Sequence, residues 1–181
     1  MYFKIDVNLT DDDYIDYNIF ISVRSTYGKK NLRNLRILLT MVFAMASLIS
    51  FFQNGFEILG FITVTFLLVL FVLFQVFLHS FFTWNLKKQI KLLKKDGKMG
   101  YSPFSSFEFY DEKFIEETEH SKSEIKYTNL ERISVVDEKV IYLHVSNVGA
   151  YVIPMSSFGA SDTYNRFMEF IKTKCQNIDI Y

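Results

Sequence analysis

The chain has 181 residues, 20 basic and 20 acidic side chains, and 50% hydrophobic residues. Its single cysteine, Cys175, excludes an internal disulfide framework and is expected to be a packed helix residue rather than a nucleophile. The charge is uneven, because residues 101–181 hold 13 acids and 8 bases, a net charge of −5, whereas residues 87–98 hold six lysines and one acid, Asp96. This balance gives no reason to expect a nucleic-acid partner, and it predicts an acidic domain beside a basic segment.

The first thirty residues predict a strand followed by an amphipathic helix. Apolar side chains alternate with polar ones over residues 2–9, which is the pattern of a half-buried strand. Thr10 is placed as a helix N-cap, with three aspartates in the first turn, where the helix dipole favours carboxylates. We expect this helix to run for about fifteen residues from Asp11 and to be closed by Gly28 and the two lysines after it.

Two long uncharged runs predict a pair of membrane-spanning helices. They are Ile37–Phe52 and Ile58–Phe77, and 16 of the 20 residues in the second are Leu, Ile, Val or Phe. The first run covers only about 24 Å as a helix, so it must extend into its flanks to cross about 30 Å of hydrocarbon. We therefore expect spans at about 35–54 and 58–82, within a hairpin segment 32–98.

The basic residues that flank the two spans predict their orientation. Lys and Arg are retained on the cytoplasmic side, and here they precede the first span and follow the second, whereas the connection 53–57 has none. Both termini should therefore be cytoplasmic, in a multi-pass protein of the cell membrane. A cleavable secretory signal is not expected, because the N-terminus is acidic and the first apolar run begins too far into the chain.

The second helix is expected to continue past the membrane to about Asp96, followed by Gly97. Trp84 is placed as an interfacial anchor, and apolar residues recur at helical spacing beyond it. Six lysines share this stretch. They serve as topology determinants and, as a compatible second interpretation, bind the headgroups of anionic lipids. The candidate headgroup ligands are Lys87, Lys88, Lys91, Lys94, Lys95 and Lys98.

Residues 101–181 predict a small α+β domain. After Ser105 the apolar residues alternate, with charged turns at 111–113 and 137–139, which is typical of antiparallel hairpins. Ser161 or Asp162 is expected to cap a final helix with one apolar stripe, formed by Tyr164, Phe167, Met168, Ile171 and Cys175. Because an isolated strand is unstable in water, we expect the strand over residues 2–9 to be added to the sheet that forms after Ser105.

Three segments of this domain resemble a known family. The runs 123–133, 140–143 and 150–158, with Tyr127, Ile133, Pro154 and Phe158 at their spacing, look like the C-terminal domain of the YcxB-like family of small bacterial membrane proteins. In that family two spans precede the domain. The resemblance implies a pleckstrin-homology-like fold, in which an antiparallel sheet or partial barrel is capped by a C-terminal helix. It implies no established activity and no catalytic residues.

Motifs for catalysis, cofactors or metals are not found in the sequence. The three histidines, His79, His120 and His144, are scattered and have no partners at metal-ligand spacing, and the seven glycines form no phosphate-binding loop. Runs of acidic residues at 11–13 and 116–119 are better explained as a solvated helix start and an exposed strand face. We therefore expect no enzyme, no catalytic residue, no metal and no cofactor.

One polar stripe interrupts the second apolar run. Gln75, His79 and Thr83 are one helical turn apart, and ionisable groups within spans are candidates for a proton or ion path. The alternative is that they join the two spans, because the first span offers a face of small residues at Thr40, Ala44 and Ser47 for close packing.

The sequence thus favours a membrane-anchored interaction or regulatory module whose cytosolic domain binds a protein or lipid partner. The alternative is an oligomeric transport or channel component that uses the polar stripe, and self-association of the chain stays open in either case. A third possibility, an enzyme with a cation on its acidic face, is the weakest.

Overall fold

The structure, a computed structural model, describes residues 1–54, 57–97 and 100–181 and divides them into two compact units. The sheet unit consists of residues 1–17 and 96–181, and the helical unit consists of residues 18–95. The chain is therefore of the α+β class, with antiparallel sheets and two long apolar helices, as the sequence predicts.

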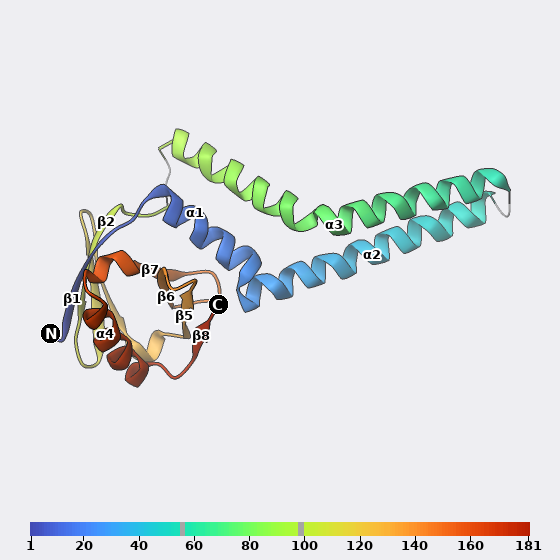
Figure 1. Cartoon of the computed structure of the whole chain (residues 1–181). Coiled ribbons are helices and arrows are strands. Elements are labelled where there is room, and N and C mark those ends of the chain that lie inside the picture. The colour runs from blue at the N-terminus through green and yellow to red at the C-terminus, as the bar shows by residue number, and fades with distance from the viewer. Residues whose placement is uncertain (55–56, 98–99) are drawn as a thin grey trace. The chain divides into compact units, whose positions relative to one another are not determined.

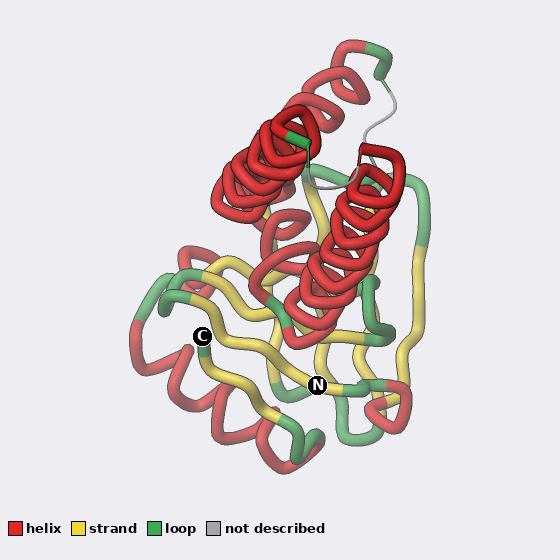
Figure 2. Tube along the Cα trace, turned by 90° about the vertical axis from the view of Figure 1, so that its right-hand side faces the viewer, coloured by secondary structure: helices red, strands yellow, loops and turns green. Residues whose placement is uncertain are grey.

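Two four-stranded sheets build the sheet unit (Figures 1 and 2; strands are yellow in Figure 2). Sheet A has the order β1-β2-β3-β4, with strands β1 (Phe3–Asn8), β2 (Phe104–Phe109), β3 (Lys113–Thr118) and β4 (Lys122–Lys126). Sheet B has the order β7-β6-β5-β8, with strands β5 (Arg132–Val136), β6 (Val140–His144), β7 (Ala150–Pro154) and β8 (Ile178–Ile180). All pairs are antiparallel except β5 with β8.

The N-terminal strand is an integral part of sheet A, which confirms the prediction that it joins the later domain. β1 pairs with β2 over its whole length, from Phe3 opposite Phe109 to Asn8 opposite Phe104. Residues 9–103 are thus inserted between two neighbouring strands of one sheet. The alternation of β1 explains the pairing, because Ile5 and Val7 are each only 2% exposed while the intervening residues face solvent.

One hydrophobic core joins the two sheets and the final helix, α4 (Ser161–Lys174). Three phenylalanines of sheet A, Phe107, Phe109 and Phe114, are at most 1% exposed and meet the inner residues of β5, β6 and β7. α4 adds its predicted stripe, in which Phe167 packs edge-to-face against Phe109 at 4.9 Å between ring centroids. The expected caps are wrong: Ala160 is the N-cap and makes no side-chain hydrogen bond, so Ser161 and Asp162 lie in the first turn.

Sheet B contains two features that the sequence pattern does not reveal. The three-residue strand β8 pairs in parallel with β5, and the Asp137 N–H donates to the carbonyl of Tyr181 at 3.0 Å. The turn between β5 and β6 places both Asp137 and Glu138 at positive φ, about 50°, and the Lys139 N–H donates to the carbonyl of Val136. This is the geometry of a type I′ hairpin turn, which normally carries Asn-Gly.

Helix α1 (Asp11–Ile19) begins at the predicted cap. The Asp13 N–H donates to Thr10 Oγ1 at 3.2 Å, and the Thr10 N–H donates to an Asp13 carboxylate oxygen at 2.8 Å, which is a reciprocal capping box. α1 continues into a π-helical turn, Phe20–Arg24.

The expected end of this helix at Gly28 is wrong, because Ser25 breaks it and starts α2 (Thr26–Asn54). Ser25 is extended, and its hydroxyl both donates to the Ile21 carbonyl at 2.7 Å and accepts from the Gly28 N–H at 3.0 Å. A Cβ on Gly28 would lie 2.5 Å from the Ile21 carbonyl oxygen. Gly28 is therefore required because two backbone segments approach closely at this corner, and not because a helix ends there.

In the helical unit, α2 and α3 (Ile58–Lys95) form an antiparallel hairpin (Figure 1). Both helices are long and apolar enough to cross a membrane, with mean hydropathies of 2.1 and 2.7, and only 6% of each apolar window is buried. Of the small residues expected to pack closely against the other helix, Thr40 and Ala44 are exposed and Ser47 is half-buried. Together the two helices line an apolar groove of about 200 Å³, formed by Thr40, Phe43, Ala44, Ser47, Val64, Leu67, Leu68 and Phe71.

Candidate partner-binding site

The polar stripe of α3 does not form an enclosed path within the helical unit. Gln75 and Thr83 are half-buried, but His79 is exposed. The Thr83 hydroxyl lies within hydrogen-bond distance of the carbonyls of His79 and Ser80, at 3.1 and 3.0 Å, so it satisfies backbone groups of its own helix. The three residues follow one line along α3 as predicted, and their role stays a prediction.

The lysines at the end of α3 share one face of the helix. Lys87, Lys88, Lys91, Lys94 and Lys95 recur at intervals of one, three and four residues within an unbroken helix, and all five are exposed. Ile90, beside this face, is buried, and Lys88 Nζ lies 5.4 Å from the centre of the Trp84 ring. Lys98, the sixth predicted ligand, lies outside the described residues.

The histidines and acidic groups are dispersed. Within residues 1–54, 57–97 and 100–181, the structure brings together no group of three His, Cys, Asp or Glu side chains that could hold a metal ion. His120 is exposed in the β3–β4 turn, whereas His144 is fully buried on β6. Cys175 is also buried, at the end of α4.

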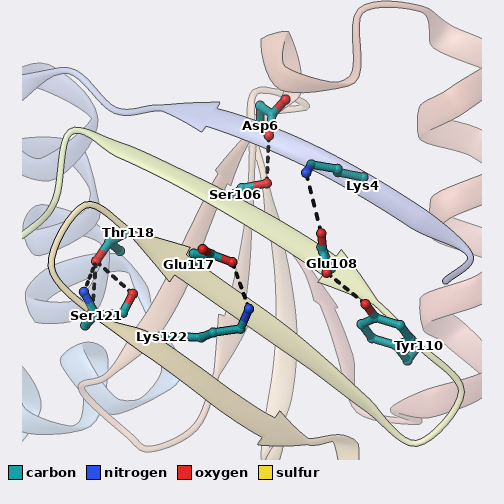
Figure 3. Close-up of polar contacts among 9 residues, drawn as sticks. All are labelled: Lys4, Asp6, Ser106, Glu108, Tyr110, Glu117, Thr118, Ser121 and Lys122. Atoms are coloured by element: carbon teal, nitrogen blue, oxygen red, sulfur yellow. Dashed lines mark hydrogen bonds and ion pairs between the residues drawn. The ribbon is translucent and has the colours of Figure 1, made fainter.

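The outer face of sheet A is a ladder of polar contacts between neighbouring strands (Figure 3). The Ser106 hydroxyl donates to an Asp6 carboxylate oxygen at 2.7 Å, and Lys122 Nζ lies 2.9 Å from Glu117. Glu108 lies between Lys4 and the Tyr110 hydroxyl, which donates to it at 2.8 Å. That hydroxyl, more than the lysine, holds the pKa of Glu108 below its ordinary value. The polar groups named here are thus compensated by neighbours on the same face.

At one end of this ladder lies an open depression of about 630 Å³. Its lining comes from the residues just before β1, the β2–β3 turn, the first residue of β3 and the end of β4: Met1, Tyr2, Tyr110, Asp111, Glu112, Lys113, Glu124 and Lys126. The volume is within the range of ligand sites in proteins. Met1 and Tyr2 are 68% and 61% exposed, so the depression combines uncovered apolar surface with charges of both signs.

Several contacts hold the lining in place. The Tyr2 N–H donates to the Phe109 carbonyl at 2.8 Å, and the Tyr127 hydroxyl donates to the Tyr110 carbonyl at 3.0 Å. Lys174, from α4, pairs with Asp111 at 2.7 Å across the rim, and Lys113 pairs with Glu124 at 2.8 Å. The depression is therefore a built feature of sheet A and not a loose loop.

Sequence reasoning does not identify this depression. Residues 111–113 are correctly predicted as a turn, but nothing in their pattern shows what they face. The signal that points there is indirect: once the strand over residues 2–9 is paired with β2 in antiparallel register, its first residues must lie beside the β2–β3 turn.

Comparison with known proteins finds a family for the C-terminal part of the chain. Residues 109–171 match the YcxB family, described as YcxB-like protein. The matched segment runs from the end of β2 to within α4 and includes the turn at the depression. No curated protein and no solved structure matches the chain.

Proposed function

Since residues 109–171 match the model of the YcxB-like protein family, we propose that this chain is a membrane-anchored interaction or regulatory module. In this proposal α2 and α3 cross the bacterial cell membrane, and the sheet unit is a cytosolic, pleckstrin-homology-like domain that binds a protein partner. The proposal rests mainly on one observation. Two apolar helices, whose surfaces are almost entirely exposed, are inserted in the chain between β1 and β2, which pair with each other in sheet A.

The insertion supports a membrane hairpin in two ways. A core helix of a water-soluble protein is covered by its own chain, whereas 6% burial leaves the apolar surfaces of α2 and α3 to be covered by lipid. Moreover, Asn8 and Phe104, which flank the insert, are paired in sheet A. A segment that leaves a sheet and returns to the neighbouring position must cross a membrane an even number of times.

The distribution of bases supports a cytosolic sheet unit. Basic residues precede the apolar part of α2 and end α3, and the described residues at the hairpin tip, Gln53 and Glu57, carry no positive charge. Two mainly antiparallel sheets and an amphipathic helix near the C-terminus, packed on their shared core, are consistent with the pleckstrin-homology-like arrangement.

The depression is the surface that we assign to the partner, and a short segment of another protein is the occupant. Exposed Met1 and Tyr2 offer apolar contact area, and the carboxylates and lysines around them suit backbone and side-chain groups of a peptide.

The lysine face of α3 is assigned a second, supporting contact with anionic lipid headgroups. Keeping the end of α3 on the cytoplasmic side requires only enough positive charges, at any position around the helix. Here the exposed lysines beyond Trp84 lie on one side of the helix, an arrangement that suits contact with a charged surface. Each lysine near an anionic surface contributes about 1 kcal/mol, an attraction that salt screens.

Crosslinking of the full-length protein in cells tests the partner site. A photoreactive amino acid at Tyr2 should capture a discrete protein partner, and the same group at Val148, which is 58% exposed but outside the depression, should not. Equal capture from both positions, or none from Tyr2, would contradict the site. Reporters of periplasmic location test the anchor: they should be active after Asn54 and silent at Met1 and Tyr181.

Complementation of a deletion phenotype separates this function from transport. If the chain is an interaction module, a variant with Gln75→Leu, His79→Leu and Thr83→Val should restore the phenotype, and a variant that ends before Tyr101 should not. The reverse result would favour the transport alternative.

A further inference from the structure

A buried polar cluster lies on the outer face of sheet B, on the opposite side of its strands from the core. β5 and β6 place Ile133, Val135, Ile141 and Leu143 in the core, so the residues between them point outward. The outer-face cluster is defined by Tyr17 of α1 and by Arg132, Ser134, Tyr142 and His144.

The members of the outer-face cluster are held close together. The register places Arg132 opposite His144 and Ser134 opposite Tyr142. Ser134 Oγ lies 3.0 Å from His144 Nε2, and the ring of Tyr17 packs on Tyr142 at 5.3 Å between centroids. Ser134 and His144 are both 0% exposed and Tyr142 is 1% exposed. A sheet face that is normally solvated is here an interior.

Arg132 is the unusual member of this cluster. Its Nε and Nη2 atoms are buried, and among the described residues neither has a hydrogen-bond partner. These two nitrogens form one edge of the guanidinium group, the edge that binds a carboxylate or a phosphate through two parallel hydrogen bonds. Buried donors of a charged group are seldom left unpaired, because their loss of hydration is then uncompensated.

We propose that the Nε–Nη2 edge of Arg132 is a binding site for an oxyanion that presents two oxygens on one centre, a carboxylate or a phosphate. The rest of the Arg132 side chain is only half-buried and stands at the first position of β5, so the site is at the margin of the sheet and not in its centre. This site is separate from the depression in sheet A and does not depend on it.

The electrostatics of the cluster agree with an anion as the ligand. Burial and, to a smaller extent, the charge of Arg132 lower the pKa of His144 to about 4, so the imidazole is neutral at neutral pH. Arg132 is then the positive charge of the outer-face cluster, and one bound anion balances it. The Tyr17 hydroxyl is already committed, because it donates to the Val148 carbonyl at 2.7 Å.

Thermal unfolding of the full-length protein in nanodiscs of neutral lipid tests the proposal, with inorganic phosphate or acetate replacing chloride at constant ionic strength and pH. One of the two anions should raise the midpoint of the sheet unit by about 4 °C or more. Arg132→Gln should abolish this rise. Phosphate alone as the active anion indicates a phosphorylated ligand, and acetate alone indicates a carboxylate.

Two further variants make the outcome decisive. Arg132→Lys retains the charge and the stem but lacks the two-donor edge, so it should lose most of the anion-dependent rise even if Arg132→Gln fails to fold. Arg166→Gln removes an exposed arginine of α4 and should retain the full rise. The proposal is overturned if neither anion shifts the wild-type midpoint, or if Arg132→Lys shifts as the wild type does.

Discussion

The outer faces of the two sheets differ although the same domain builds both. Sheet A follows the simple rule of a half-buried sheet: one face enters the core, and the other carries polar side chains that pair in solvent. Sheet B is buried on both faces at β5 and β6, where four successive residues of each strand are buried. Its outer face contains a histidine, a serine and part of an arginine.

Polar residues thus have different roles on the two outer faces. On sheet A the polar groups keep the sheet soluble, and each exposed pair contributes little to stability. On sheet B the polar groups are buried. In the interior, a polar group without a hydrogen-bond partner, or one in the charged form, lowers the stability of the fold. The same residue types should therefore tolerate substitution on one sheet and not on the other.

The largest effect is expected on the inner face of sheet A. Ile5→Asp would bury a carboxylate in the shared core and should lower the free energy of unfolding by about 4 kcal/mol or more, measured by thermal or denaturant unfolding of the full-length protein. Asp6→Asn, one residue away on the outer face, should change it by less than about 0.5 kcal/mol. Similar effects for the two variants would contradict the two-sided description of β1.

The second effect concerns the outer face of sheet B and depends on pH. The pKa of His144 is lowered from 6.5 to about 4, so between these values the unfolded chain binds a proton that the folded chain does not. The free energy of unfolding should therefore fall as the pH drops from about 6.5 to 4, with about 3 kcal/mol from this residue.

The comparison between variants isolates the histidine from other titrating groups. His144→Gln should remove this part of the pH dependence, whereas His120→Gln, at a side chain that is 86% exposed, should leave it unchanged. If the unfolding curves of wild type and His144→Gln ran parallel from pH 6.5 to 4, the proposed burial of a neutral imidazole would be wrong.

A smaller effect, of opposite sign, is expected at the turn between β5 and β6. Glu138 has a φ of 51°, which is unfavourable for a residue with a Cβ, so Glu138→Gly should raise the free energy of unfolding by about 0.5–1 kcal/mol. Lys139→Gly, at the next residue, should lower it instead, because only chain flexibility is gained there. Urea unfolding resolves differences of this size.

The smallest effect is expected on the outer face of sheet A. Lys122 and Glu117 pair at 2.9 Å, but their side chains are 58% and 57% exposed. Lys122→Ala should therefore change the free energy of unfolding by less than about 0.5 kcal/mol, and high salt should reduce the difference further. A loss above about 1 kcal/mol would mean that this face is covered in the native protein.

The features that were predicted from sequence are those with a strong local signal. Alternation identifies β1, the Thr10 capping box marks the start of α1, and the length of the apolar runs identifies α2 and α3. The addition of β1 to the later sheet was also predicted, because an isolated strand is unstable in water; the structure pairs it with β2.

Features set by tertiary contacts were missed for physical reasons. β8 is three residues long, too short to show a period, and Gly28 is required by backbone proximity that no local pattern encodes. The depression and the outer-face cluster arise where separate strands meet. For the cluster a signal was present, since nearly continuous apolar runs in β5 and β6 indicate burial on both faces.

The insertion of residues 9–103 between β1 and β2 has a consequence during synthesis. β1 leaves the ribosome first, and its pairing partner follows only after both apolar helices have been made. If only one helix enters the bilayer, β1 and β2 end on opposite sides and Ile5 and Val7 stay exposed to water. If α2 and α3 cross a membrane as proposed, the sheet unit can therefore complete sheet A only after both helices have been inserted.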